Sequence, residues 1–433
     1  MSYLLRIFWI LLWLTLLFLP QAVGFFFYES SDDEDDDDDD QLMLNMLYAA
    51  PMMAALWWEM FGYTPRLPPI IEQRASWQEH RENLIQRNIF RPMYRMTPES
   101  FDRLIEKLGD DINVDADMAY RRTQAGPVIA EWRLAMTLRW LSGGSLWESV
   151  AWIRLHKSTF YNIVWETCGI INECGPLAFR FPQTEEEVKA LSSGFESIST
   201  EGVVNCCVGV IDGWLMHTTA PTGVGNVNAY FSGHYQKYGY NVQAVVDHKC
   251  RFLYAKIAAP GGQPDINALK ACSDLLDFLK GLPFGHYIIG DNAYPPREYL
   301  LPVFGGNERR ARGHDDTNFF MSQCRIRSEM AFGMMTNKFG IFQRPLKKIA
   351  KHNLNKLLEA ICRLHNFCID ERIYDVNGVP PHQQPFDEDN PRSTPGERVT
   401  VAEISGQSRT RARLVQRVLR LGLTRQQPIA NRY

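Results

Sequence analysis

Three acidic residues stand where strands and a helix could present them to one cleft. Residues 208–213 read VGVIDG, an apolar run that closes on Asp212 and a glycine. A second apolar run, in HYIIGDNAYPP, ends at Asp291, and Glu329 lies in a stretch with helical patterning. An acid at the end of a strand-like run lies where the chain leaves the core, so its side chain can converge with others.

Three carboxylates held close together repel one another, which raises their pKa values unless a cation neutralises them. Mg²⁺ or Mn²⁺ suits this role, because hard divalent ions prefer oxygen ligands. Two such ions about 4 Å apart activate a water or hydroxyl on one side of a phosphodiester and stabilise the leaving oxygen on the other. Taken singly, each acid is more readily explained as a turn former or surface residue. Their order on strand, strand and helix favours a shared two-metal site.

The elements around these acids predict an α/β fold. From residue 200 the strand-like runs are VVNCCVGVID, YNVQAVVD and FLYAKIAA, separated by turn residues. The helical stretch INALKACSDLLDFLKGL, the strand-like HYIIG and the helical QCRIRSEMAFGMMTNKFGIF follow. Three strands, a helix, a strand and later helices predict a mixed sheet with helices packed on its faces.

Helical patterning occupies the preceding region, beginning at SWQEHRENLIQRNIF. In TPESFDRLIEKLGD the apolar positions predict an amphipathic helix that ends near Gly109. A later helix is predicted to stop at Gly143, Ser145 with Glu148 forms a capping-box signature, and Ser158 suits the N-cap of a third helix. Helix, short turn, helix is the layout of a helix-turn-helix DNA reader. Three short packed helices also occur in many other proteins, and the third helix is not rich in arginine or lysine.

Six motifs stand out in the chain: GVIDG at 209, NAYFSGHYQKYGYNVQAVVD at 228, PGGQPD at 260, GDNAYP at 290, RIRSEMAFG at 325 and CRLHNF at 362. Together they resemble the DDE transposases of the PIF/Harbinger family and their domesticated nuclease relatives. The resemblance that they carry covers roughly residues 90–370. The resemblance implies an RNase H-like fold whose catalytic acids, here Asp212, Asp291 and Glu329, bind two divalent ions. It also implies a metal-activated water that cuts DNA at transposon ends, after which the freed 3′ hydroxyl can attack target DNA.

The resemblance brings two further expectations. Asp265, in PGGQPD, matches an acid that recurs in the family between the two aspartates, and is the runner-up metal ligand or a residue that supports the ligands. The family typically relies on a separate Myb/SANT-like protein for DNA recognition or import.

Some positions depart from the family pattern. Leu215 stands where a histidine is usual, with His217 two positions later. Ser328 stands before the third acid where an apolar residue is usual, and Thr336 replaces a frequent lysine. None of these changes removes a catalytic acid. The alternative to an active nuclease is a catalytically inactive, transposase-derived DNA-binding or adaptor protein.

Basic residues near the third acid are candidates for holding DNA through its phosphates. A solvated surface explains the loop NERRARGH equally well, and QRPLKKIAKHN is weak as a nuclear import signal. The candidate DNA-binding residues are Arg309, Arg310, Arg312, Arg325, Arg327, Lys347 and Lys348. The stretch from Arg409 to Tyr433 has seven arginines, no acid and apolar residues at helical spacing. Such a basic amphipathic helix could bind DNA, bind a membrane surface or cover the domain, and DNA is favoured by the rest of the chain.

Composition and length predict the organisation of the 433-residue chain. Its net charge of −4 includes nine acids in DDEDDDDDD, and Arg6 and Glu29 cancel, which leaves +5 for residues 41–433. A mildly basic body is compatible with a polyanionic partner without being diagnostic of one. The expected segments are 1–24, signal-like and apolar; 25–76, acidic and irregular linker; 77–199, helical; 200–372, catalytic; and 373–433, Pro-rich linker and basic tail.

Two observations disagree about the compartment. Arg6 precedes IFWILLWLTLLFL and QAVG, which together have the pattern of a secretory signal but are too short for a confident membrane span. Nine cysteines without regular spacing indicate reduced thiols rather than a disulfide framework. We expect the nucleus, with the secretory pathway as the alternative if the N-terminal segment is a real signal. A membrane partner is not favoured, and a homo-oligomer stays open.

Overall fold

The computed structural model describes residues 74–122, 126–347, 349–373 and 408–425. These residues all lie in one compact unit, which spans residues 71–433. The predicted signal-like segment, the acidic linker as far as residue 73, and the Pro-rich linker lie outside the described residues. Within those ranges, no helix combines the length and apolar character needed to cross a membrane.

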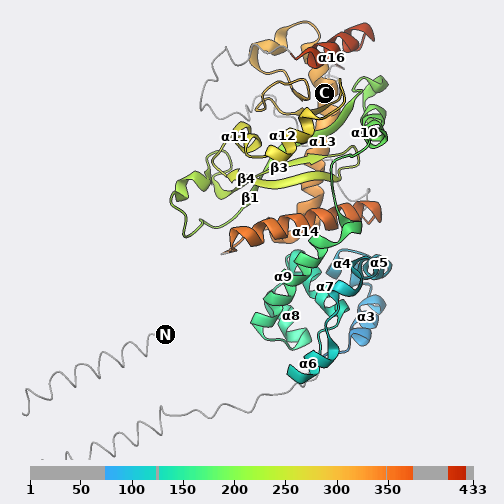
Figure 1. The fold of residues 1–433 in the computed structure, drawn as a ribbon, viewed down its shortest axis with the longest axis vertical. Coiled ribbons are helices and arrows are strands. Elements are labelled where there is room, and N and C mark those ends of the chain that lie inside the picture. Colours follow the sequence, from blue (N-terminus) through green and yellow to red (C-terminus); the bar gives the residue numbers. More distant parts are fainter. Residues whose placement is uncertain (1–73, 123–125, 348, 374–407, 426–433) are drawn as a thin grey trace, which may run out of the picture. The chain divides into compact units, whose positions relative to one another are not determined.

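A helical region comes first (Figure 1), as predicted. Its helices are α3 (Trp77–Gln86), α4 (Phe90–Tyr94), α5 (Pro98–Leu108), α6 (Ala116–Arg122), α7 (Ala130–Leu141), α8 (Leu146–Ile153) and α9 (Lys157–Glu173). Helix α10 (Glu185–Ile198) follows and lies beside the sheet (Figure 1), where Val188 packs in the same cluster as Ile211. The Thr97 hydroxyl accepts a hydrogen bond from the Ser100 backbone N–H at 3.2 Å and caps α5. Gly109, with a φ of +59°, ends this helix where the sequence predicts.

The turns on either side of α8 confirm one predicted cap and correct another. Ser145 caps α8, and its hydroxyl accepts from the Trp147 backbone N–H at 3.2 Å. Glu148, the predicted second member of a capping box, instead pairs with Arg139 at 2.8 Å. The prediction of Ser158 as the cap of α9 is wrong: the cap is His156, whose Nδ1 accepts from the Ser158 N–H at 3.3 Å. A neutral imidazole nitrogen can accept this bond as a hydroxyl does. A DNA-reading role for α7, α8 and α9 stays a prediction.

A mixed sheet follows, which confirms the predicted α/β class. Its strands are β1 (Cys207–His217), β2 (Phe231–Ser232), β3 (Lys237–Val246), β4 (Phe252–Pro260), β5 (Tyr287–Gly290) and β6 (Leu300–Pro302). The strand order is β2-β3-β1-β5-β6, and β4 also pairs with β3. Strand β3 is antiparallel to its three neighbours β1, β2 and β4, whereas β5 is parallel to both β1 and β6.

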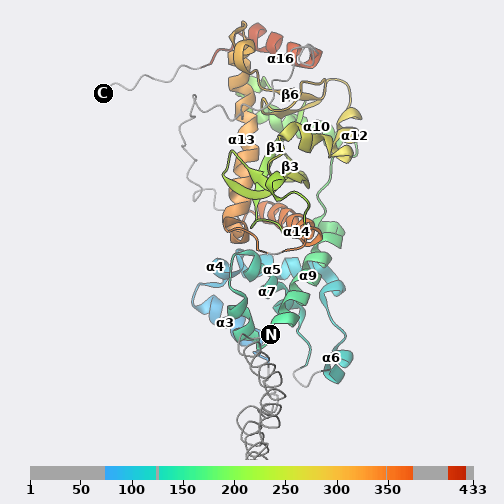
Figure 2. The ribbon, with the colours of Figure 1, turned by 90° about the vertical axis from the view of Figure 1, so that its left-hand side faces the viewer.

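Helices cover both faces of the sheet, as Figure 2 shows. Two short helices, α11 (Asp265–Lys270) and α12 (Ser273–Lys280), lie on one face, where the sequence predicts one continuous helix. Two long helices, α13 (His314–Lys338) and α14 (Lys351–Asp370), lie on the other. Side chains of β1 alternate between the two faces: Ile211 packs in the cluster that includes Leu275 of α12, and Val210 in the cluster that includes Phe332 of α13.

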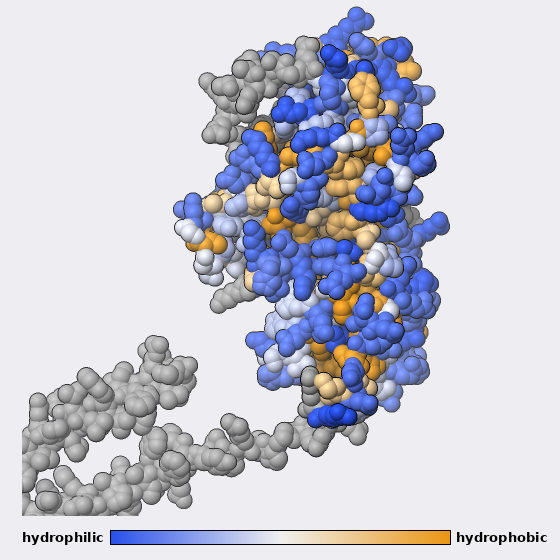
Figure 3. Space-filling view, in the orientation of Figure 1, coloured by the Kyte–Doolittle hydropathy of each residue, from blue (hydrophilic) through white to orange (hydrophobic). Residues whose placement is uncertain are grey.

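Helix α14 lies between the sheet and the helical region in both views (Figures 1 and 2). The Asn172 side chain of α9 donates to the Lys356 carbonyl at 3.0 Å, and Arg363 of α14 donates to the Cys174 carbonyl at 3.2 Å. His365, also on α14, is a buried core residue, and its Nε2 lies 2.9 Å from the Cys250 carbonyl. On the face shown in Figure 3, hydrophilic residues dominate and apolar residues gather in smaller groups between them.

Candidate active site

Asp212 and Asp291 are brought together by the parallel pairing of β1 with β5. Val210 pairs with Ile289, and each acid lies two residues further along the chain from its member of that pair. Strand β5 ends at Gly290, just before Asp291. The two carboxylates therefore emerge side by side at the carboxyl end of β5.

The expectation that Asp212 ends its strand is wrong. Strand β1 continues to His217, and Asp212 lies within it, opposite Ala244 of β3. The strand continues because β3 pairs with it along its whole second half, although its other neighbour, β5, has already ended. Asp212 is therefore held by pairing on one side, and the end of β5 leaves room for the second acid on the other.

The side chain of Asp212 faces helix α13. Trp214, two residues along β1 and so on the same face, stacks on Phe332 of α13 with ring centroids 5.7 Å apart. The Ser328 hydroxyl donates to Asp212 Oδ2 at 3.1 Å. Ser328 is one of the departures from the family pattern, and it supplies a direct contact between α13 and the first acid.

The surroundings of Asp212 favour its protonated form. Burial, followed by the negative charges of Asp291 and Asp265, raises the pKa of Asp212 to about 7, although Arg325 and the Ser328 hydrogen bond act in the opposite direction. The Asp291 carboxylate is fixed locally, because its Oδ1 accepts from the Ala293 backbone N–H at 2.8 Å. The pair therefore has the repulsion expected of two carboxylates that share a site without a cation.

Glu329 lies on α13 directly after Ser328, with its side chain 39% exposed. Its Oε1 pairs with Arg325 Nη1 at 3.2 Å. Arg325 also lies close enough to Asp212 to lower the pKa of that residue. The structure thus brings Asp212 and Asp291 together, and connects Glu329 to them through Arg325 and Ser328.

Asp265 lies on the opposite face of the sheet from Asp212. A Cβ at Gly213 would lie 2.2 Å from Asp265 Oδ1, so the side chain of Asp265 occupies the space that the glycine leaves. That oxygen accepts from Asn241 Nδ2 at 2.9 Å and from Gln243 Nε2 at 3.0 Å. Because Asp212 and Gly213 are adjacent in one strand, their side-chain positions point to opposite faces. Asp265 therefore supports β1 from beneath the candidate site.

A buried polar network of Tyr294, Gln243 and Asn241 extends this support, and none of these three residues was predicted from the sequence. The Tyr294 hydroxyl donates to Gln243 Oε1 at 2.7 Å, and Gln243 Nε2 donates to Asn241 Oδ1 at 2.8 Å. Burial, with the negative charges of Asp265, Asp212 and Asp291, raises the pKa of Tyr294 well above its usual value. A usable signal was present in YNVQAVV, where two amides alternate within an otherwise apolar strand and so share one face.

The predicted DNA-binding residues near α13 do not all face the candidate acids. Arg325 faces the acids, whereas the Arg327 guanidinium interacts with Cys250, in the turn between β3 and β4. Lys347 is exposed, and Lys348 lies outside the described residues.

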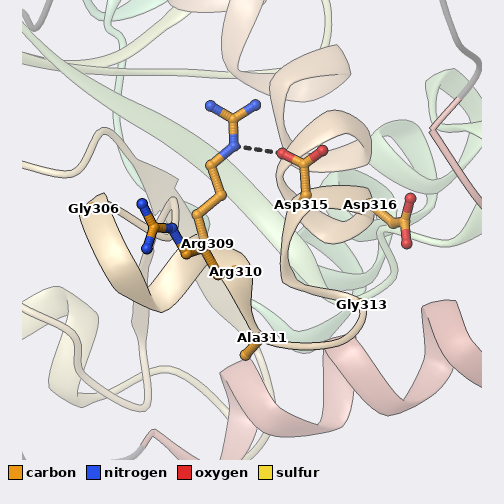
Figure 4. A pocket seen from close by; sticks show the side chains of 7 residues that line it. All are labelled: Gly306, Arg309, Arg310, Ala311, Gly313, Asp315 and Asp316. Atoms are coloured by element: carbon orange, nitrogen blue, oxygen red, sulfur yellow. Dashed lines mark hydrogen bonds and ion pairs between the residues drawn. The ribbon is translucent and has the colours of Figure 1, made fainter.

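The predicted basic loop forms the short 3₁₀ helix η5 (Gly306–Arg310) and its end. Arg309 pairs with Asp315, whereas the Arg310 guanidinium points away from both Asp315 and Asp316 (Figure 4). These residues line an open hollow of about 440 Å³ that contains none of the three candidate catalytic acids. Arg312 is exposed beside it.

The donor set fits a hard divalent ion only in part. Within the described ranges, no group of three or more histidine, cysteine, aspartate or glutamate side chains is arranged to hold a metal ion. The adjacent carboxylates of Asp212 and Asp291, one with a raised pKa, nevertheless have the oxygen donors and mutual repulsion that such an ion would relieve. Glu329 would join them once its carboxylate leaves Arg325.

Comparison with known proteins supports an assignment for the sheet region. Residues 211–366 match a family model described as DDE superfamily endonuclease. The match supports this superfamily for the segment from β1 to α14, and the matched range contains Asp212, Asp291 and Glu329. No curated protein and no solved structure matches the chain.

Proposed function

We propose that this protein is a divalent-metal-dependent DNA endonuclease or transposase of the PIF/Harbinger type, with Asp212, Asp291 and Glu329 as its DDE triad. The adjacency of Asp212 and Asp291 at the carboxyl end of β5, inside the range that matches DDE superfamily endonucleases, carries the proposal. The strand order, with antiparallel β4, β3 and β1 followed by parallel β5 and β6, supports an RNase H-like fold.

Each residue has a distinct part in the proposed chemistry. Bound Mg²⁺ or Mn²⁺ would activate the attacking oxygen and neutralise charge at the scissile phosphate. Asp212 and Asp291 would hold the ion, with Glu329 completing the set. The Ser328 hydroxyl holds Asp212 Oδ2, and Asp265 supports β1 from the opposite face of the sheet. Arg325, released from Glu329, would stand beside the ion and the DNA phosphate.

Nicking of supercoiled DNA by the full-length protein tests this proposal. Cleavage is expected with Mg²⁺ or Mn²⁺ and not with Ca²⁺ or EDTA. Asp212→Asn, Asp291→Asn and Glu329→Gln should each abolish it, whereas Asp277→Asn, which changes an exposed acid of α12, should not. Circular dichroism establishes that each variant is folded. Retained cleavage in all three triad variants would contradict the proposed mechanism.

One observation favours the alternative, a catalytically inactive DNA-binding or adaptor protein. Glu329 pairs with Arg325 rather than with the two aspartates. This alternative predicts DNA binding that needs no divalent ion, together with no cleavage under Mn²⁺, even when a Myb/SANT-like partner and transposon-end DNA are added.

We further propose that the protein acts in the nucleus on DNA, with a Myb/SANT-like partner and as a homo-oligomer on paired ends. The mildly basic charge of residues 41–433 supports a polyanionic substrate. Microscopy of the full-length chain tests the compartment: a secretory location would favour the alternative based on residues 1–24. Light scattering with and without DNA ends tests the oligomer.

A further inference from the structure

Helix α16 (Arg409–Arg420) divides its side chains between two opposite faces. Leu414, Val415 and Val418 are buried on one face. Arg409, Arg413 and Arg420 are exposed, and their spacing of four and seven residues places them together on the other face. The predicted basic amphipathic helix therefore exists, and its apolar face is already covered.

The covered face is anchored by directed contacts. The buried Arg411 guanidinium donates to Glu308 Oε1 at 2.9 Å and Oε2 at 3.1 Å, and it stacks 3.6 Å from the centre of the Phe304 ring. Glu298 accepts from the backbone N–H groups of Arg409, at 2.7 Å, and Thr410, at 3.0 Å. These contacts attach α16 to the segment between Asp291 and α13 and fix which arginines face outward.

The acidic side chains in the segment that α16 packs against, Glu308, Asp315 and Asp316, already bind other groups. Glu308 binds Arg411, and Asp315 binds Arg309 and, at 3.5 Å, Arg425. Asp316 accepts from the Arg425 backbone N–H at 2.7 Å.

The outward arginines are less engaged: Arg409 lies close enough to Glu298 to help lower the pKa of that carboxyl, and the Arg413 guanidinium lies 4.8 Å from the centre of the Phe284 ring. In the part of the chain that the structure describes, Arg310, Arg312, Arg413 and Arg420 form no ion pair. In Figure 4, Arg310 points away from the neighbouring aspartates. The surface therefore keeps an excess of exposed positive charge.

We infer that Arg409, Arg413 and Arg420 of α16, with Arg310 and Arg312 of the segment that α16 packs against, bind the phosphates of duplex DNA that flanks the cleavage site. This inference rests on the proposed function. At 1.5 Å per residue the arginine face is about 17 Å long, which spans roughly five phosphates of one strand. Guanidinium groups match phosphate in geometry. A membrane surface fits less well, because a helix that binds lipid needs its apolar face free.

The position of α16 gives the distance from the acids. It packs at the start of α13, where a Cβ at Gly313 would lie 2.9 Å from Leu419. Fifteen residues of helix separate His314 from Glu329, or about 22 Å at 1.5 Å per residue, which corresponds to six or seven base pairs. A duplex that extends less than this on one side of the cut would not reach the arginines.

Salt dependence of DNA binding tests the inference. The full-length protein, in an Asp291→Asn background that prevents cleavage, is titrated with a 40-base-pair duplex of random sequence at several salt concentrations. Loss of three phosphate contacts, in the triple variant Arg409→Ala, Arg413→Ala and Arg420→Ala, should reduce the slope of log K against log[salt] by about 2.7. The control Lys189→Ala, Lys249→Ala and Lys270→Ala removes the same charge at exposed positions and should leave the slope nearly unchanged.

Three outcomes decide the inference. A duplex too short to extend about six base pairs to either side of the acids should bind the Asp291→Asn protein no more tightly than the 40-base-pair duplex binds the triple variant. Equal slopes for the triple variant and the lysine control would overturn the inference. Loss of binding only to phosphatidylserine vesicles or to an acidic peptide would also overturn it and assign the surface to those partners. Binding is measured without cleavage, so failure of the nuclease proposal would appear separately, as absent nicking with an intact slope.

Discussion

At the scale of single residues, Asp212 links the candidate site to the stability of the fold. Its pKa is raised to about 7 from an ordinary value of 3.8. Between these values the folded protein holds a proton that the unfolded chain releases, so the free energy of unfolding falls as pH rises from about 4 to about 7. The effect is on the order of 4 kcal/mol, at 1.36 kcal/mol per pKa unit.

Urea unfolding in EDTA at pH 5 and pH 8 measures this prediction. Asp212→Asn should remove that part of the pH dependence, because an amide does not titrate, whereas the control Asp277→Asn should keep it. Addition of Mg²⁺ at pH 8 should stabilise the unmodified protein more than Asp212→Asn, since binding to the folded state alone raises stability. An equal pH dependence in the unmodified protein and Asp212→Asn would show that Asp212 titrates normally.

At the scale of elements, the contact between Gly213 and Asp265 holds β1 against α11. A methyl group in Gly213→Ala would lie 2.2 Å from Asp265 Oδ1, so α11 must move and its bonds to Asn241 and Gln243 must lengthen. Overpacking of this kind typically costs about 1–3 kcal/mol. Urea unfolding measures the loss. Gly225→Ala is the matched control, because no atom lies within 4 Å of a Cβ at that position. Equal stability of the two variants would contradict the proposed support.

The sequence predicted the elements better than their ends. Period and turn residues located the strands and α5, because these signals depend on neighbouring residues. The end of β1 was misjudged at Asp212, because the strand continues through pairing with β3, which lies more than twenty residues away in sequence. Helix α13 begins at His314 rather than Gln323, since the polar residues of its first turns carry little periodic signal.

For the candidate site, the sequence pointed to the acidic residues but not to their side-chain contacts. Residue types and order pointed to Asp212, Asp291 and Glu329, and the strand register accounts for the first two. The pairing of Glu329 with Arg325 depends on side-chain positions that no spacing records. The placement of Asp265 beneath Gly213 depends on which face α11 covers, which is a long-range property of the chain.

At the scale of the whole molecule, the helical region and the sheet share one core. The same cluster of buried residues contains Phe101 of α5, Phe160 of α9, Leu357 of α14 and Val210 of β1. Helix α14 contacts both parts, so neither part keeps its packing when the other unfolds. We therefore expect residues 77–373 to unfold in one cooperative transition, although composition alone predicted a boundary near residue 200.

Phe160→Ala tests this coupling, because Phe160 is fully buried in α9 and is far along the chain from the acids. Removing a buried aromatic ring should cost about 3–5 kcal/mol. Hydrogen exchange should then speed up at the amides of β1 and β5 by the same free energy as in α9. Tyr120→Ala, which truncates an aromatic side chain that is 62% exposed, is the control and should leave exchange unchanged. Unchanged protection of β1 and β5 in Phe160→Ala would make the sheet an independent unit. Equal loss would mean that the register holding Asp212 beside Asp291 depends on helices outside the range that matches the endonuclease family.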